Sequence, residues 1–344
     1  MTSSKPFLQA LQGEIVSPSP CWFMRQAGRY LPEYRELRKQ AKNFLDFCFT
    51  PDMAVEATHQ PLRRYAMDAA ILFSDILVIP HGLGQDVAFR EGEGPVLQAL
   101  ETAADFEMLD VDAVAGRLAP VMETVRRVAA GLDDRTALVG FAGAPFTVAL
   151  YMIEGRGGTE GTKIRRWAAE RPEEFSRLMD ILCDATSRYL IAQIDHGAEA
   201  LQLFDSWAGL LPESQFRRWI IEPNRRIVER VHDVHPNVPI IGFPRNAGVL
   251  YKDFARETGV NGLSIDAGVP LEWAAAELQS LCTVQGNLDN HLLLGGGAAL
   301  DHDVRRILDN LSNGPFIFNL GHGVLPPTPP EHVGRVVDLI RGAA

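Results

Sequence analysis

Metal-binding and disulfide signals are missing from this sequence of 344 residues. Its cysteines, at Cys21, Cys48, Cys183 and Cys282, form no Cys-x-x-Cys pair, and no His-x-Cys occurs. A zinc site or a disulfide framework requires such spacings. We therefore expect reduced thiols, no metal centre and a cytoplasmic location.

Long apolar runs and a basic excess are missing as well. The first residues, MTSSKPFLQALQGE, lack the apolar segment of a signal peptide, and no apolar run reaches the roughly 18 residues of a membrane span. The formal net charge is -11, whereas nucleic acids and anionic membranes bind to basic faces. We therefore expect neither nucleic acid nor membrane as a partner, although an acidic protein can still hold a local basic site.

Three motifs of nucleotide and nucleophile chemistry are also missing. No Gly-x-Gly-x-x-Gly follows the first apolar run, which argues against a dinucleotide-binding sheet. The glycine-rich segment 154–163 ends in a lysine but lacks the spacing of a phosphate-binding loop. Ser206 has no Gly-x-Ser-x-Gly around it, so a nucleophilic serine is not predicted.

Short apolar runs are what the sequence has instead. They occur at 21–26, 68–77, 137–143, 200–206, 239–244, 262–268, 282–289 and 316–323. Amphipathic segments between them include 51–66, which Pro61 is expected to kink or split, and also 172–198, 212–233 and 331–342. Apolar runs that alternate with helices indicate a parallel sheet buried on both faces. The sequence therefore predicts one (β/α)8 TIM barrel domain over 1–344, with a doubly wound open sheet as the alternative.

Polar side chains gather at the ends of these apolar runs. They are Arg25, Asp75, Ser206, Arg245, Asp266, Asn287, Asp289 and His322. Barrel enzymes build their active sites at the carboxyl ends of their strands. We therefore expect these side chains to converge on one end of the barrel.

The stretch PCWFMRQAGRYLPEYRELR is unusual because it concentrates positive charge in an acidic chain. It contains Arg25, Arg29, Arg35 and Arg38. A guanidinium can hold a carboxylate or a phosphate with two parallel hydrogen bonds, so the first two arginines are candidates for an anion clamp. The alternative is a surface ion pair with Glu33 or Glu36. For Arg35 and Arg38, the sequence favours this alternative and anion binding equally.

Four further residues are candidates from their settings. Asp75 has apolar neighbours on both sides, which favours an acid, base or acceptor over a structural ion pair. His322 stands between two glycines as a hydrogen-bond donor or proton shuttle, or as a loop histidine bonded to the backbone. Tyr151 lies about two turns into a predicted helix, where a core role is the more common one. Asp205 is expected to cap a helix.

Several ordered segments resemble the uroporphyrinogen decarboxylase family over nearly the whole length. They are PCWFMRQAGRYLPEYR, GFAGAPFTVALYMIEG, FSDIL, QLFDSWAG, GNLD and NLGHGVLPPTPPE. The resemblance implies a barrel, a homodimer, and a cofactor-independent lyase of haem (porphyrin) biosynthesis. Such an enzyme removes CO2 from the four acetates of uroporphyrinogen III to give coproporphyrinogen III. The residues that match the family's substrate site are Arg25, Arg29, Arg38, Asp75, Tyr151, Phe204, Ser206 and His322.

The resemblance also implies roles for these residues. Asp75 would accept hydrogen bonds from the pyrrole N–H groups and stabilise a cationic ring, and Arg25 would position the reacting acetate. Phe204 would pack against the macrocycle, while the remaining polar residues bind carboxylates or orient the ring. The segment 154–163 departs from the family pattern in being longer and richer in glycine, and it is a candidate cover for the substrate.

Three other functions are alternatives to this one. A zinc-dependent or corrinoid-linked methyltransferase can share the barrel, but the absence of His-x-Cys argues against it. A tetrapyrrole or organic-anion binding protein without catalytic activity is a second alternative. An interaction protein without a substrate site is the third, and the polar strand ends argue against it.

Overall fold

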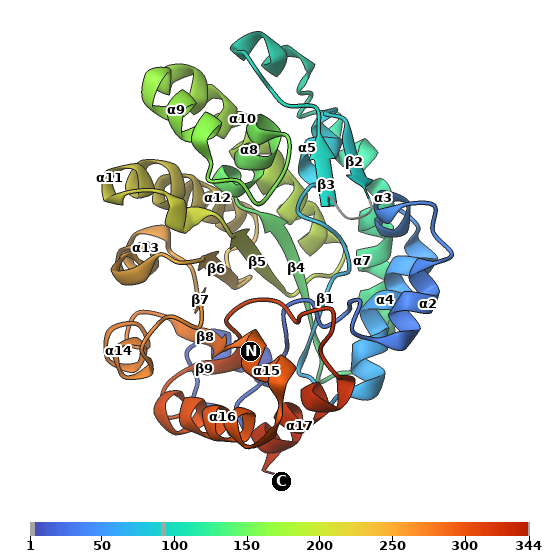
Figure 1. Ribbon diagram of the computed structural model, residues 1–344, viewed down its shortest axis with the longest axis vertical. Helices are drawn as coiled ribbons and strands as arrows, with labels where there is room; N and C mark the ends of the chain where they lie inside the picture. Colours follow the sequence, from blue (N-terminus) through green and yellow to red (C-terminus); the bar gives the residue numbers. More distant parts are fainter. Residues whose placement is uncertain (1–3, 91–93, 343–344) are drawn as a thin grey trace.

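The computed structural model describes residues 4–90 and 94–342. Its centre is a curled sheet of seven parallel strands in the order β1-β4-β5-β6-β7-β8-β9 (Figure 1). Their bounds are β1 Ala69–Ile71, β4 Ala137–Gly143, β5 Ala200–Asp205, β6 Ile240–Pro244, β7 Gly262–Ser264, β8 Thr283–Leu288 and β9 Phe316–Leu320. All seven residues of β4 are buried, as expected of a strand covered on both faces.

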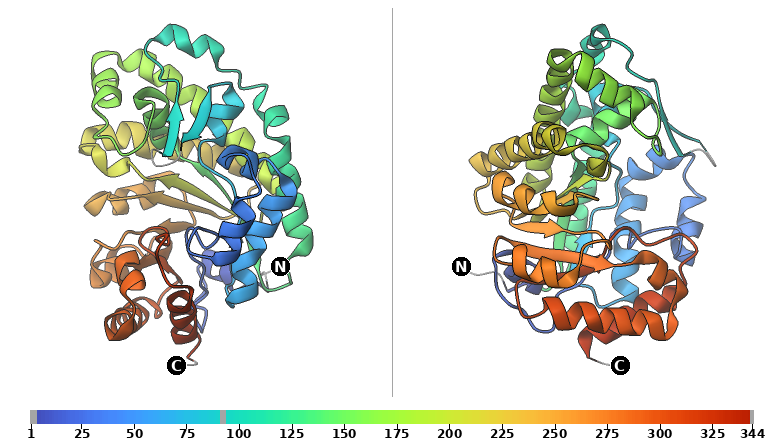
Figure 2. Two further views of the ribbon diagram at one scale, coloured as in Figure 1. Left: turned by 45° about the vertical axis from the view of Figure 1, so that its right-hand side comes forward. Right: turned by 60° about the vertical axis from the view of Figure 1, so that its left-hand side comes forward.

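Helices surround the sheet on its outer side (Figure 2). They are α1 Pro6–Leu11, α2 Pro32–Arg38, α3 Phe44–Cys48, α4 Pro51–Arg64, α5 Val78–Leu83, α6 Val114–Arg117, α7 Ala119–Gly131, α8 Pro145–Glu154, α9 Thr162–Glu170, α10 Pro172–Asp195, α11 Glu213–Phe216, α12 Glu222–Val234, α13 Tyr251–Thr258, α14 Leu271–Glu277, α15 Asn290–Gly295, α16 Gly297–Leu311 and α17 Pro330–Arg341. Short 3-10 turns lie at Ala103–Met108, Ala208–Leu210 and Gly248–Leu250. A separate antiparallel pair is formed by β2 Val87–Arg90 and β3 Gly94–Leu97.

The first apolar run does not form a regular strand, although it occupies the place of one. Residues 20–24 lie between the two edges of the sheet: Phe318 N donates to Pro20 O at 2.8 Å, and Asp68 N donates to Cys21 O at 2.8 Å. Only Cys21 forms a bridge, with Phe318 of β9. The segment, called here the closing segment, therefore joins β9 to β1 and completes the TIM-barrel-like fold. The open-sheet alternative is wrong.

Competition by side chains explains why the closing segment is not a full strand. Pro20 has no N–H to donate. The N–H of Cys21 donates instead to the carboxylate of Asp68 at 2.7 Å, and that of Met24 donates to Asn319 Oδ1 at 3.1 Å. With its donors used in this way, the segment cannot build a continuous ladder with either neighbour.

The predicted helices are confirmed with two differences. Segment 51–66 forms the single helix α4, which contains Pro61 and is not split by it. Segment 212–233 is interrupted by a π-helical turn at Arg217–Ile221, where Glu222 N bonds to Arg217 O. Pro223 follows that turn and has no N–H for the usual bond four residues back, so the regular ladder is broken there.

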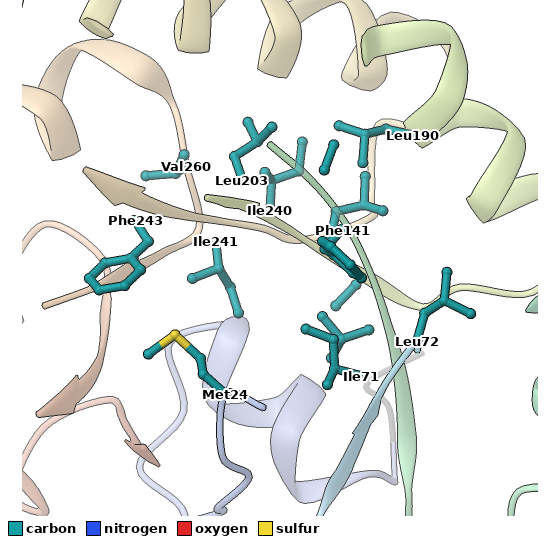
Figure 3. Close-up of a cluster of buried hydrophobic side chains, with 14 of the residues drawn as sticks. Met24, Ile71, Leu72, Phe141, Leu190, Leu203, Ile240, Ile241, Phe243 and Val260 are labelled. Carbon is teal, nitrogen blue, oxygen red and sulfur yellow. The ribbon is translucent and has the colours of Figure 1, made fainter. Parts of the chain in front are cut away.

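The interior of the barrel is mainly apolar. Figure 3 shows Met24, Ile71, Phe141 and Ile241 gathered from the closing segment, β1, β4 and β6, and all are buried. Since opposite sides of the sheet contribute, the barrel is filled by side chains.

A polar chain crosses the same interior. Trp22 Nε1 donates to Gln285 Oε1 at 2.8 Å, and Gln285 Nε2 donates to Gln202 Oε1 at 3.0 Å and Ser264 Oγ at 3.2 Å. These buried amides are therefore paired, which removes the cost of placing polar groups in the core. In the described part of the chain, no helix is both long and apolar enough to cross a bilayer.

Candidate active site

The carboxyl ends of the strands bring five of the predicted residues to one end of the barrel. Arg25 follows the closing segment, Asp75 lies between β1 and α5, and Tyr151 lies on α8, directly after β4. Ser206 follows β5 and His322 follows β9. The strands are parallel and share one carboxyl end. Residues as far apart in the chain as Arg25 and His322 therefore contribute to one site.

The backbone at Arg25 is strained. Its φ of 62° lies in the left-handed region, which costs an L-residue about 1 kcal/mol or more. Gly323 makes room for its side chain, because a Cβ there would lie 2.4 Å from Arg25 Cδ. The adjacent Val324 N donates to Met24 O at 2.9 Å. The closing segment and the loop after β9 are therefore joined around this guanidinium.

Electrostatic interactions place Arg25 among the other candidates. Burial by surrounding protein atoms lowers its pKa, Asp75 and Tyr151 raise the pKa, and Arg29 and Arg245 lower it. The side chain is nevertheless exposed to solvent, and an arginine stays charged at neutral pH. It is therefore a charged group that a ligand can reach.

Asp75 is a half-buried carboxylate without a cationic contact. Burial raises its pKa, while the hydrogen bond from Leu77 N to Oδ1, at 2.8 Å, and the charge of Arg25 lower the pKa. None of the ion pairs formed by the described residues includes Asp75. The alternative of a structural ion pair is therefore wrong, and neither carboxylate oxygen is bonded to a cation among the described residues.

Tyr151 and His322 are both neutral polar groups in this site. Burial raises the pKa of Tyr151, so its hydroxyl is a donor at neutral pH. Burial, Arg25 and Arg245 lower the pKa of His322 to about 3, so its ring is uncharged and can both donate and accept. Within the part of the chain that the structure describes, His322 makes no hydrogen bond to the backbone. The loop-histidine alternative is therefore wrong.

Phe204 and Ser206 come from the end of β5. The Phe204 ring meets Phe141 edge-on at 5.6 Å and Phe243 at 6.4 Å between ring centroids. Side chains alternate along a strand, so Ser206 follows Phe204 on the same face. Both side chains are half-buried, which leaves part of an aromatic ring and a hydroxyl accessible at this end of the barrel.

The N-terminal arginines are not paired with the nearby acids. Glu33 pairs with Arg64, and Glu36 pairs with Lys39 at 2.7 Å. The ion-pair alternative is therefore wrong for all four arginines of the stretch. The exposed Arg29 has no ion pair in the described chain, and its charge acts on Arg25 and on Tyr34.

Arg35 and Arg38 differ from the first two. Arg35 Nη1 donates to two backbone carbonyls, Arg29 O at 2.8 Å and Tyr30 O at 3.2 Å, and so holds the turn before α2. Arg38 Nη1 donates to Ala41 O at 3.2 Å, and its guanidinium lies 6.0 Å from the Phe47 ring centroid. Arg38 thus has protein partners, whereas no hydrogen bond or ion pair joins the Arg25 side chain to another described residue.

Three of the polar strand ends have structural partners. Asp266 accepts from Tyr251 Oη at 2.7 Å and from Asn246 N at 2.9 Å. Asn287 Nδ2 donates to the carbonyl of Asp266 at 3.1 Å, and Asp289 caps α15. All three lie at the carboxyl ends of β7 and β8, as expected, and their side chains hold loops there.

Asp205 does not cap the helix that follows it, contrary to expectation. Its carboxylate accepts from Thr147 Oγ1 of α8 at 2.6 Å and from Asn224 Nδ2 of α12 at 3.3 Å. Thr147 Oγ1 in turn accepts from Trp207 N at 3.1 Å. The carboxylate therefore ties the end of β5 to the helix that carries Tyr151. Burial raises its pKa to about 6, against the lowering effect of these hydrogen bonds.

We expect Asp205→Asn to remove a pH dependence of stability. The unfolded carboxyl has a pKa near about 3.9, below the folded value of about 6. Stability from the protonated folded form is full below about pH 4 and is lost as pH rises through about 6, by up to about 3 kcal/mol. The neutral amide does not titrate. Urea unfolding at pH 5 and pH 7.5 measures this, and parallel pH dependences of variant and wild type would contradict it.

The glycine-rich segment contacts the site residue Tyr151. A Cβ on Gly157 would lie 2.7 Å from the Tyr151 hydroxyl oxygen. The segment is fixed to the β2–β3 pair, because Leu97 N donates to Gly155 O at 2.8 Å. A position so close to this hydroxyl accepts only glycine without rearrangement. Among the described residues, no group of three His, Cys, Asp or Glu side chains is placed to hold a metal ion.

Comparison with known proteins identifies the family. The family model described as uroporphyrinogen decarboxylase matches residues 2–343. A protein of Rhodospirillum rubrum named uroporphyrinogen decarboxylase is 59% identical over 339 residues, covering 98% of this chain and 97% of that protein. A protein of the same name from a Chelativorans species is 52% identical over 339 residues, covering 98% of each chain.

Solved structures support the fold. A methyltransferase from Methanosarcina mazei has a TM-score of 0.78 at 17% identity, covering 98% of this chain and 97% of that one. At that identity the likeness concerns the fold alone. The family match covers residues 2–343, which include all the strand-end residues described above. This chain therefore belongs to the uroporphyrinogen decarboxylase family.

Proposed function

We propose that this chain is a uroporphyrinogen III decarboxylase, which removes CO2 from four acetates to give coproporphyrinogen III in haem biosynthesis. The relatives at 59% and 52% identity carry the name of this enzyme. The observation that carries the proposal is the juxtaposition of a half-buried, unpaired Asp75 with the accessible guanidinium of Arg25. A macrocycle with acidic substituents and pyrrole N–H groups needs both kinds of partner.

The substrate residues of the proposal are those that match the family. They are Arg25, Arg29, Arg38, Asp75, Tyr151, Phe204, Ser206 and His322. An octacarboxylate requires positive charge, and Arg25 and Arg29 supply it within a chain of net charge -11. Arg38 differs from these two in having protein partners of its own. The half-buried Phe204 ring offers an apolar face to the macrocycle.

The reaction requires an acceptor for the electron pair of the broken bond. Protonation of the pyrrole carbon beside its nitrogen gives an iminium-like cation. The carbon–carboxylate bond then breaks, CO2 leaves, and the electron pair moves into the ring. A proton added to the exocyclic carbon and one lost from the ring carbon complete the methyl group, so each acetate consumes one proton.

Asp75 stabilises the cation in this scheme. Its carboxylate accepts hydrogen bonds from pyrrole N–H groups while Oδ1 is held by Leu77 N at 2.8 Å. An oriented negative charge next to a developing positive charge lowers the barrier more than it strengthens substrate binding. Arg25 orients the reacting acetate, and the neutral His322 and Tyr151 supply hydrogen bonds without adding charge.

Three further parts of the proposal concern the whole protein. Residues 1–344 form one barrel domain, two copies form a homodimer, and the enzyme acts in the cytoplasm. The family model spans 2–343 without division, which supports a single domain. Sedimentation of the purified chain tests the homodimer.

Incubation with uroporphyrinogen under anaerobic conditions tests the activity. The oxidised products are separated by their number of carboxyl groups, and we expect species with seven, six, five and finally four carboxyls to follow one another. Boiled enzyme is the control. Recovery of the eight-carboxyl species alone would overturn the decarboxylase and leave an organic-anion binding protein.

A further inference from the structure

Arg245 lies at the same end of the barrel as the proposed substrate residues. It follows β6 directly, and the parallel register of β5 on β6, continued by one residue, sets it beside Ser206. Alternation along the strand places its side chain on the face of Phe243. The ring of Phe243 packs against Phe204 at 6.4 Å between centroids. Arg245 is therefore adjacent to two members of the proposed site.

The backbone around Arg245 is held in a strained form. Its N–H donates to Asp205 O at 3.1 Å, and its carbonyl accepts from Gly209 N at 3.1 Å. The next residue, Asn246, has a φ of 62°; within residues 4–90 and 94–342, it and Arg25 are the non-glycine residues with positive φ. Residues with a Cβ adopt this left-handed backbone rarely, although asparagine does so more readily than most. Both strained positions therefore present or adjoin a guanidinium of this site.

Among the described residues, the side chain of Arg245 has no partner for its charge. It is half-buried, and it takes part in none of the ion pairs that the described residues form. Its Nε atom is buried without a hydrogen-bond partner among those residues. A donor shielded from water and left unpaired is costly. Its charge acts on Arg25 and on His322, so the site also bears like-charge repulsion.

An anion bound between the guanidiniums would accept from the unpaired Nε of Arg245 and offset the repulsion between Arg245 and Arg25. We propose that Arg245 binds a carboxylate of the substrate, as a further guanidinium beside Arg25 and Arg29. This inference rests on the proposed function, because it takes the ligand to be a polycarboxylate. The acidic substituents surround the rim of a macrocycle, so cations on more than one strand are needed to hold it. Arg25 comes from the closing segment, and Arg245 adds a cation from β6.

The test compares Arg245→Gln and Arg245→Lys with wild-type enzyme. We expect the glutamine variant to raise KM for uroporphyrinogen about 10- to 100-fold, the effect of losing a charged hydrogen bond, with a much smaller change in kcat. The lysine variant keeps the charge but not the planar fork, so its KM should lie between those of the wild type and the glutamine variant. Arg306→Gln on α16, which removes an exposed pair with Asp303, is the matched control with unchanged KM.

Thermal unfolding separates binding from a structural role. Removing an unpaired charge relieves repulsion, so we expect the glutamine variant to unfold at the wild-type temperature or above it. A lower unfolding temperature with unchanged KM would overturn the inference, and so would unchanged KM in both variants.

A binding measurement distinguishes this failure from failure of the proposed function. Equilibrium binding of uroporphyrin, an oxidised octacarboxylate, is followed by fluorescence for the wild type and for Arg245→Gln. This measurement does not depend on turnover. We expect Kd for the glutamine variant to rise about tenfold or more. A wild type that binds without turnover would overturn the decarboxylase alone, whereas equal Kd values would overturn the role of Arg245.

Discussion

Asp75→Asn is expected to lower kcat about 100- to 1000-fold, the size of effect seen when a group that stabilises charge in a transition state is removed. Asparagine has nearly the same shape, and its Oδ1 can still accept from Leu77 N, which in the wild type donates to Asp75 Oδ1 at 2.8 Å. It cannot offset the positive charge that develops on the pyrrole. KM should therefore change by much less than kcat. Steady-state turnover of uroporphyrinogen under anaerobic conditions measures both constants.

A matched control accompanies the Asp75 variant. Asp134→Asn removes an exposed carboxylate from the loop before β4, at the opposite end of that strand from α8. Its kcat should equal that of the wild type. Wild-type kcat in Asp75→Asn would refute the electrostatic role, and a rise in KM alone would reassign Asp75 to substrate binding.

Arg25→Gln is expected to lower kcat/KM roughly 1000-fold, because a guanidinium that holds a carboxylate contributes two charged hydrogen bonds of about 1.5–3 kcal/mol each. Arg25 has no ion pair within the described chain, so little stability is lost with its charge. Arg25→Lys keeps the charge without the fork and should retain an intermediate activity. Single-turnover measurements separate the effect on binding from the effect on the chemical step.

Arg64→Gln provides the comparison for the Arg25 variants. Arg64 is a partly exposed arginine that pairs with Glu33 on the neighbouring α2. Its loss should cost no more than about 1 kcal/mol of stability and leave kcat/KM unchanged. If the Arg25 variants kept wild-type kcat/KM, the reacting acetate would have to be held by another group.

The barrel and the place of the site could be predicted because both follow from local patterns. Strands buried on both faces are continuous apolar runs, and seven of the eight predicted runs form strands of the sheet. Parallel strands end on one side, so polar residues such as Asp75 and His322, which follow apolar runs, were expected together. Arg245 follows the same pattern, but nothing near it in sequence shows that its Nε lacks a partner among the described residues.

The sequence by itself determined which segments are buried, which helices cover them and at which end charged groups gather. Only the tertiary structure decided which polar groups are already paired. Asp205 is bonded to Thr147, which is 58 residues away, and Cys21 N is bonded to Asp68, which is 47 residues away. Periodicity depends on a residue and its near neighbours, whereas pairing depends on long-range packing. The free charges of Arg25 and Asp75 therefore became visible only in the folded chain.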